Sequence, residues 1–111
     1  MEHRMNLWAS PFRHIKHGAK TVEMRLNDEK RRKIQVGDII IFTNAETQEE
    51  MKVSVVNISK FSDFAEIYSK YDKIAIGYEA DEIAHPDDML LYYSKEKIAQ
   101  YGVLAIEIKL I

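Results

Sequence analysis

The sequence predicts an α+β fold dominated by β-strands: a small, mainly antiparallel, curved sheet or barrel whose openings are covered by short helices. About five segments read as strands, and short helical segments lie between them. Two of the strands are joined by a polar, hairpin-like stretch, and the spacing is too irregular for the repeated βαβ units of a parallel sheet. With 111 residues, 46% of them hydrophobic, we expect one domain over residues 1–111.

The first elements are a strand, a short helix and a second strand. Residues 4–8, RMNLW, are suited to an opening strand. Ser10 and Pro11 then form a helix start, with Ser10 as the cap and Pro11 at the first helical position, where no amide hydrogen is needed. Gly18 ends this helix, and residues 20–26 follow as a strand with alternating side chains.

A helical turn and a hairpin occupy the middle of the chain. Asn27 or Asp28 can cap a single turn that begins with acidic side chains, as the helix dipole favours. The strand IIIFT at 39–43 is followed by the polar connection 44–50. The chain then returns as a strand over 51–61, so these two strands are expected to pair in antiparallel fashion.

Short helices precede the last strand. Residues 62–70 show helical spacing of apolar side chains, with Ser62 as the predicted cap. One or two further short helices are expected over 86–101, the second capped by Ser94. The apolar segment 103–111 is the final strand.

Charge is unevenly distributed along the chain. The net charge is only −2, so the molecule as a whole does not attract nucleic acid strongly. Residues 1–36 contain nine Lys and Arg against four Asp and Glu, whereas residues 37–111 contain seven against fourteen. A local basic face that attracts an anion is compatible with this split, and so is an ordinary solvated surface.

Several classes of function are excluded or unsupported. The sequence has no cysteine and only four isolated glycines, so thiolate chemistry and glycine-rich phosphate loops are absent. His14 and His17 are three residues apart but have no further ligands at suitable spacing, so we expect neither a metal nor a cofactor. The N-terminal residues lack the apolar core of a secretion signal, and the longest apolar run has four residues. A cytoplasmic protein without membrane contact is expected.

The strand at 20–26 holds the first candidate site. Glu23 and Arg25 are two residues apart, so they share one face of the strand. Lys20 has the opposite parity, but the preceding glycine allows a twist that turns it to either side. In a partly buried cleft these groups can serve as a base, a carboxylate and a planar cation. On an outer face they are a solvated ion pair with little energetic effect.

Two further groups of side chains are candidates for ligand binding. The basic cluster Lys30, Arg31 and Arg32 can contact phosphates, or it can be a solvated turn of helix. The aromatic residues Trp8, Tyr92 and Tyr93 can stack on nucleobases or serve as core and lid residues.

Glu96 follows the tyrosine pair at helical spacing. One helical face can therefore present both the aromatic rings and a carboxylate.

The motif around the charged strand is similar to that of a known family. PF..I..G.KT.E.R followed by DEKR..I..GD.I.F resembles the ASCH domain, which is related to the PUA domain. The family signature G-x-K-x-x-E-x-R falls here on Gly18, Lys20, Glu23 and Arg25. The C-terminal YYSKEKIAQYGVLAIEI also resembles the closing helix and strand of small bacterial members, so the resemblance covers nearly the whole chain.

The resemblance implies a PUA-like β-barrel of about five to six strands whose cleft holds the signature residues, and RNA or a modified nucleobase as the partner. Some small members hydrolyse N4-acetylcytidine with a lysine, a threonine and a distal glutamate. Lys20 matches that lysine, Glu23 stands at the threonine position, and Glu96 is the candidate for the distal glutamate. Three functions follow: binding of RNA or a modified nucleoside, metal-independent hydrolysis of an N-acylated nucleoside, and a protein-interaction module without catalysis.

Overall fold

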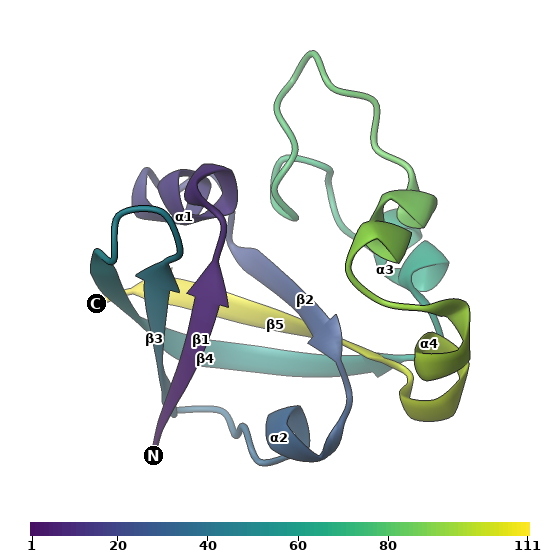
Figure 1. The fold of residues 1–111 in the computed structure, drawn as a ribbon, viewed down its shortest axis with the longest axis horizontal. Coiled ribbons are helices and arrows are strands. Elements are labelled where there is room, and N and C mark those ends of the chain that lie inside the picture. The colour runs from purple at the N-terminus through teal and green to yellow at the C-terminus, as the bar shows by residue number, and fades with distance from the viewer.

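A computed structural model describes residues 1–111, which form one curled, five-stranded sheet with the strand order β1-β3-β4-β5-β2. Neighbouring strands are antiparallel except for the parallel pair β1 and β3. The sheet curls into a half-barrel, so its two edge strands, β1 and β2, lie on the same side of the molecule (Figure 1). The strands are β1 (Glu2–Leu7), β2 (Val22–Leu26), β3 (Ile39–Asn44), β4 (Glu50–Phe61) and β5 (Val103–Leu110).

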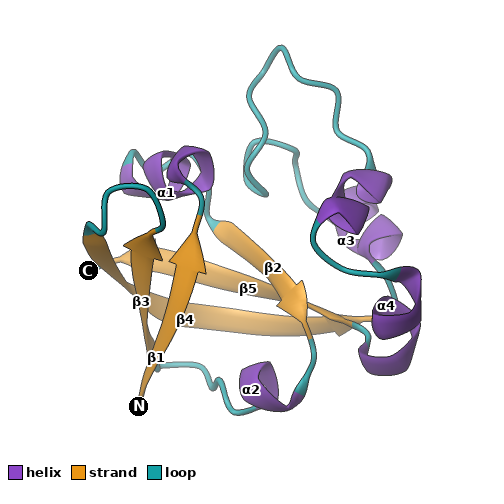
Figure 2. Ribbon diagram, viewed as in Figure 1, coloured by secondary structure: helices purple, strands orange, loops and turns teal.

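Short helices cover the ends and one side of the half-barrel (Figure 2). In that view α1 lies at the upper end of the sheet, α2 at the lower end, and α3 and α4 beside it. The helices are α1 (Ala9–Lys16), α2 (Glu29–Arg32), α3 (Phe64–Lys70), the 3₁₀ helix η1 (Pro86–Leu91) and α4 (Lys95–Tyr101). The predicted mainly antiparallel, curved α+β fold with covering helices is confirmed. No helix has the length and apolar character needed to cross a membrane.

The predicted helix caps are partly right. Asp28 caps α2 and Ser94 caps α4, each by accepting a backbone N–H three residues ahead. The N-cap of α1 is Trp8 rather than Ser10, because the helix begins as soon as the chain leaves β1. Pro11 then occupies the third helical position, where its missing N–H is still no loss. In α3 the cap is Asp63, one residue after the predicted serine.

The hydrophobic core lies on both faces of β5. Leu104 and Ile106 belong to a cluster of 13 buried residues that also contains Phe12 of α1 and Phe42 of β3. The alternate residue Val103 packs in a second cluster of nine, together with residues of α3 and β2. Because the first half of β5, Val103–Ile106, is buried on both faces, it is a continuous apolar run that joins the two halves of the core.

Substituting a central core side chain should destabilise the fold strongly. Phe42 is fully buried, so we expect Phe42→Ala to lower the free energy of unfolding by about 3–5 kcal/mol through lost burial and the cavity left behind. Urea unfolding followed by circular dichroism measures the change. Val36→Ala, which truncates an exposed side chain, is the control and should change stability by less than about 0.5 kcal/mol. Equal effects of the two substitutions would contradict this description of the core.

Candidate functional site

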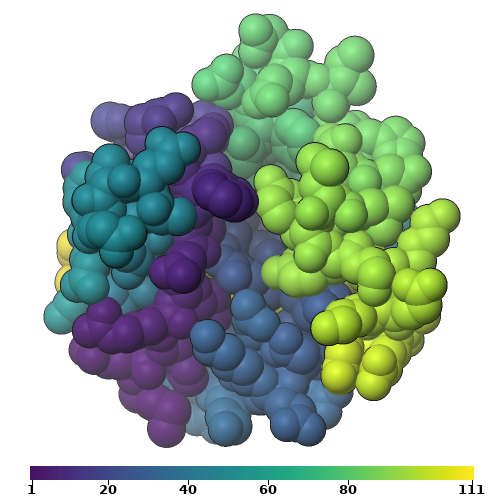
Figure 3. All heavy atoms as spheres, viewed as in Figure 1, coloured from purple at the N-terminus to yellow at the C-terminus, as the bar shows by residue number.

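The open side of the half-barrel carries a hollow in the molecular surface (Figure 3). The end of β1 and the start of α1, in purple, form one wall, and the segment around η1, in yellow-green, forms the other. Blue atoms of β2 lie deep between them, and α2 lies below. We call this depression the central hollow, and β2 is its floor.

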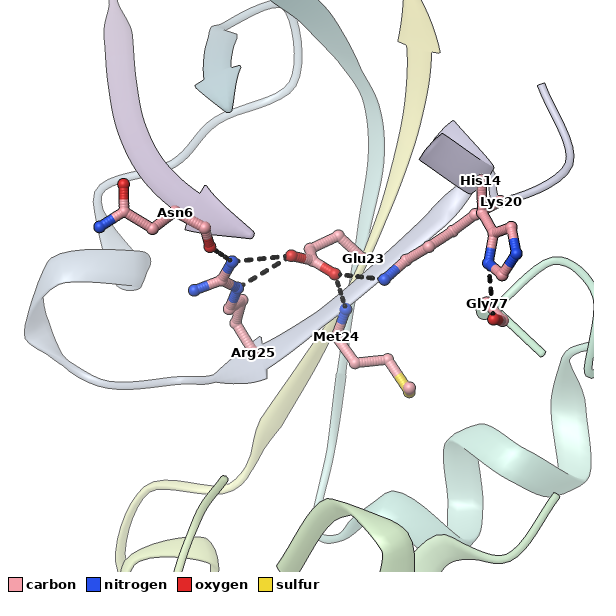
Figure 4. A network of polar contacts seen from close by, with 7 residues as sticks. All are labelled: Asn6, His14, Lys20, Glu23, Met24, Arg25 and Gly77. Atoms are coloured by element: carbon pink, nitrogen blue, oxygen red, sulfur yellow. Dashed lines mark hydrogen bonds and ion pairs between the residues drawn. The ribbon is translucent and has the colours of Figure 1, made fainter. Parts of the chain in front are cut away.

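A buried network of three charged side chains lies on β2 and immediately before it (Figure 4). Lys20 Nζ donates to Glu23 Oε1 at 2.8 Å. Arg25 donates to Glu23 Oε2 through Nε at 3.0 Å, and its Nη2 lies 2.9 Å from the same oxygen. Lys20 and Glu23 are buried, at 7% and 3% exposure, and Arg25 is half-buried. These side chains are therefore a preformed ion network and not a solvated strand face.

The local chain path explains how Lys20 reaches Glu23. Gly18, with φ of 84°, turns the chain after α1, and the backbone N–H of Lys20 then donates to the carbonyl of His14. Lys20 thus lies before the regular part of β2, where strand parity does not govern its direction. Its side chain can point along the strand toward the carboxylate three residues ahead.

A distant segment packs over the lysine. The carbonyl of Ala75 accepts hydrogen bonds from the N–H groups of Thr21 and Val22, and the carbonyl of Gly77 lies 3.1 Å from His14 Nδ1. A Cβ atom at Gly77 would lie 3.2 Å from Lys20 Cδ, so the glycine permits close approach of this segment. Lys20 is consequently covered by residues that are more than fifty positions away in the sequence.

The same network joins the two unpaired edges of the sheet. The carbonyls of Met1 and Leu7 bond toward β3, so strand alternation directs the backbone groups of Asn6 to the open edge. There the carbonyl of Asn6 accepts a hydrogen bond from Arg25 Nη2 at 3.0 Å. On β2, the edge N–H of Met24 donates to Glu23 Oε1 at 3.3 Å. Side chains of the network therefore take the place of part of a missing strand-to-strand ladder.

The charges of the network set its protonation. Burial acts to raise the pKa of Glu23, but the positive charges of Lys20 and Arg25 and their hydrogen bonds outweigh it and lower that pKa to about 2. Burial acts to lower the pKa of Arg25, whereas Glu23 and, after it, Tyr93 raise it above its usual value. At neutral pH Glu23 is an ionised acceptor with no proton to donate.

The predicted basic cluster lies on α2, at the lower end of the hollow. Lys30 is exposed, and Arg31 Nη1 pairs with Asp28 Oδ2 at 2.7 Å. Arg32 donates through Nε to the carbonyl of Asn27, and its guanidinium lies 5.9 Å from the centre of the Tyr101 ring. The three cations thus face different surroundings, although they are adjacent in the sequence.

The predicted aromatic residues divide into exposed and packed rings. Trp8, where β1 meets α1, is 60% exposed, and Tyr92, directly after η1, is 56% exposed. The junction of β1 and α1 forms one wall of the central hollow, and the segment around η1 forms the other. Tyr93 is half-buried and stacks on Phe64, with ring centres 6.0 Å apart.

Glu96 is not in the helix that was expected to contain the tyrosines. The 3₁₀ helix ends at Leu91, and α4 begins only at Lys95, after the Ser94 cap. The assumed helical spacing between Tyr92 and Glu96 therefore does not exist. Glu96 is exposed in the first turn of α4, and no hydrogen bond or ion pair links it to the network.

Sequence reasoning missed three contributors to the site. Asn6 acts through its backbone carbonyl, which has no signature in a sequence. His14 was considered only as a metal ligand, yet it contacts Gly77, which lies in a stretch without a periodic pattern. An isolated glycine in such a stretch is a weak signal of close backbone approach.

Other concave surfaces lie away from the network. One, of about 310 Å³, is bounded by α1 and the 44–49 turn, and another, of about 440 Å³, by α3, η1 and α4. Neither is lined by Lys20, Glu23 or Arg25. No group of three or more His, Asp or Glu side chains is arranged to hold a metal ion.

The fold and its curled sheet define a small PUA-like domain of mixed α and β structure. The family model described as the ASCH domain matches residues 5–111, and the chain belongs to this family.

Solved structures agree with this assignment. The crystal structure of hypothetical protein PH0355 is 36% identical, with a TM-score of 0.85 and full coverage of both chains. The solution NMR structure of protein PF0455 from Pyrococcus furiosus is 34% identical, with a TM-score of 0.78, covering 100% of this chain and 98% of that one. The crystal structure of ASCH from Zymomonas mobilis, 18% identical, shares the fold at a TM-score of 0.59 over 97% of this chain and 66% of that one. Comparison with curated proteins gave no match.

Removing the charge of Glu23 should destabilise the protein in a pH-dependent way. Glu23→Gln leaves Lys20 and Arg25 without their shared counter-charge, and we expect a loss of about 3–5 kcal/mol at pH 7. The folded pKa of about 2 lies below the ordinary value of 4.5, so the stabilisation by Glu23 is complete above about pH 4.5 and is lost as the pH falls toward 2. The difference between wild type and variant should therefore shrink over this range in urea unfolding experiments.

Two comparisons make this prediction specific. Glu29→Gln removes an exposed carboxylate and should have a small effect at every pH. Asp38 also has a pKa lowered to about 2, chiefly by its hydrogen bond with His3, and it is present in the wild type and in both variants. Its effect on stability at low pH is therefore common to all three proteins and does not alter the difference between them. A Glu23→Gln effect that stays constant from pH 7 to pH 3 would show that the network does not stabilise the fold in this way.

Proposed function

We propose that this ASCH domain binds RNA or a modified nucleoside in the central hollow, with the Lys20–Glu23–Arg25 network at its floor and aromatic side chains at its walls. The observation that carries the proposal is the buried ion network at the open side of the sheet. Three charged groups held in one place provide oriented donors and an ionised acceptor next to a surface depression.

The network is suited to recognition because it is already assembled. Glu23 is held in place by hydrogen bonds from Lys20, Arg25 and a backbone N–H. The conformational entropy of these side chains is therefore lost on folding, and ligand binding does not have to order them. Polar edges of a nucleobase carry both donors and acceptors, and a site with fixed partners discriminates against ligands that leave those partners unpaired.

The walls and the lower end of the hollow support the same class of ligand. Trp8 and Tyr92 are exposed on elements at opposite sides, where flat aromatic rings can stack on bases. The basic residues Lys30, Arg31 and Arg32 lie on α2 at one end, where phosphates would be attracted. Membership of the ASCH family carries the expectation of RNA as the partner, and stacking rings with nearby cations suit that ligand.

Truncating the exposed rings should weaken RNA binding without unfolding the protein. We expect Trp8→Ala and Tyr92→Ala each to reduce affinity for a mixed-sequence single-stranded RNA by about 5- to 150-fold, the equivalent of one stacked base. Fluorescence anisotropy with a labelled RNA octamer measures this. Ile111→Ala, which truncates an exposed side chain after β5, serves as control. Unchanged affinity in both aromatic variants would remove them from the binding surface.

A second candidate function is the metal-independent hydrolysis of an N-acylated nucleoside such as N4-acetylcytidine. The observation that favours it is the buried amine–carboxylate pair of Lys20 and Glu23 at the floor of the hollow. In that reaction the deprotonated form of Lys20 would take a proton from the water that adds to the acyl carbonyl, and Arg25 would stabilise the developing oxyanion. Lys20 would then pass this proton to the nucleoside amine as the C–N bond breaks. Glu23, ionised at neutral pH, would orient Lys20, and it could not supply the first proton to the leaving group.

The hydrolase candidate is tested by one assay. Incubation with N4-acetylcytidine is followed by the change in ultraviolet absorbance, with Lys20→Ala as the matched variant. A hydrolase should release cytidine and acetate, and the variant should lose most of that rate because it lacks the proton acceptor. Wild-type turnover that does not exceed that of Lys20→Ala would exclude this substrate and leave binding as the function of the hollow.

A further inference from the structure

A second ion pair lies next to the network, at the point where β2 leads into α2. Arg31 pairs with Asp28 within the first turn after the strand, at 2.7 Å.

The charges in this region do not balance. Lys20, Arg25 and Arg31 are cations, and only Glu23 and Asp28 are carboxylates paired with them. One positive charge is therefore left uncompensated beside the hollow. A group with a single negative charge, such as a phosphodiester, would neutralise it.

Both arginines retain unused donors. Arg25 uses Nε and Nη2 for Glu23 and Asn6, and Nη1 has no partner (Figure 4). Arg31 uses Nη1 for Asp28 and has no partner at Nη2. Its Nε is buried without a hydrogen bond, so this donor lacks the partner that a buried polar group normally has. The Nε–Nη2 edge of Arg31 therefore has no partner within the protein, and such an edge is the planar fork that binds two phosphate oxygens.

We propose that Arg31 binds a phosphate group of the ligand at the lower end of the central hollow, so that the hollow takes a nucleotide within an RNA chain and not a free nucleoside. This inference rests on the proposed function, because it assigns the backbone of a ligand whose base occupies the same hollow. It also gives Arg31 a role different from that of its neighbours on α2, since Lys30 is exposed without a hydrogen bond or ion pair and the Arg32 guanidinium lies over the Tyr101 ring.

The experiment measures binding of a mixed-sequence single-stranded RNA octamer at several salt concentrations, by fluorescence anisotropy. Arg31→Gln should weaken binding at 50 mM salt about tenfold or more, by an equal factor for different sequences. It should also reduce the slope of log K against log salt by about 0.7, because one phosphate contact is lost. Lys52→Gln removes an exposed charge on β4, which β5 separates from β2, and is the matched control.

Arg31→Lys tests the geometry of the contact. It keeps the charge and removes the planar fork, so the salt slope should stay close to that of wild type while affinity falls part of the way. Thermal unfolding of each variant by circular dichroism shows that the fold is retained. A loss of affinity in Arg31→Gln with an unchanged salt slope would assign Arg31 a structural role and overturn the phosphate contact.

The outcomes separate the two proposals. RNA binding that depends on Trp8 and Tyr92 but not on Arg31 would overturn the phosphate site and leave the proposed function in place. Binding of free N4-acetylcytidine or cytidine without binding of the RNA octamer would do the same. Absence of binding to any of these probes would overturn both.

Discussion

The carboxylate of Glu23 is the centre on which the open side of this molecule depends. Its two oxygens hold Lys20, Arg25 and a backbone N–H of its own strand, and Arg25 in turn reaches a carbonyl of β1. The half-barrel has two free edges, and unpaired backbone groups at such edges must find other partners. Here charged side chains form hydrogen bonds with some of these backbone groups. The sheet can therefore stay open without leaving those groups unpaired.

An ion network of this kind is costly to bury and is stable only when each charge has partners. Lys20 is covered by the segment around Gly77, and Glu23 has cations on both sides. Replacing such a network by apolar side chains is often neutral or favourable for stability. The network lies at the floor of a surface hollow and not within either hydrophobic cluster, and the proposed ligand recognition rests on this placement.

β2 connects the site with the core. Val22 and Met24 lie in the nine-residue cluster with α3, whereas Glu23 and Arg25, between and after them, face the network. One face of β2 thus packs against apolar side chains, and the opposite face carries the charged network. Rigid placement on a packed strand allows donors and acceptors to keep their geometry without a ligand.

Much of the fold could be predicted from the sequence because it depends on local patterns. The apolar strand segments 39–43 and 103–111, the caps Asp28 and Ser94, and the polar hairpin can all be recognised from patterns within a few residues. Even the errors were local: the cap of α3 is displaced by one residue, and the helix containing Tyr92 and Glu96 is interrupted. Short elements with competing caps leave such boundaries poorly specified.

The sequence by itself determined that Glu23 and Arg25 share a strand face, since side chains alternate with a period of two. Spacing could not decide whether that face meets solvent or a site. The tertiary structure decided it, by curling the sheet until Asn6 faces Arg25 and by laying Gly77 over Lys20. These contacts join residues 19 and 57 positions apart, and long-range packing of this kind leaves no periodic signal in the chain.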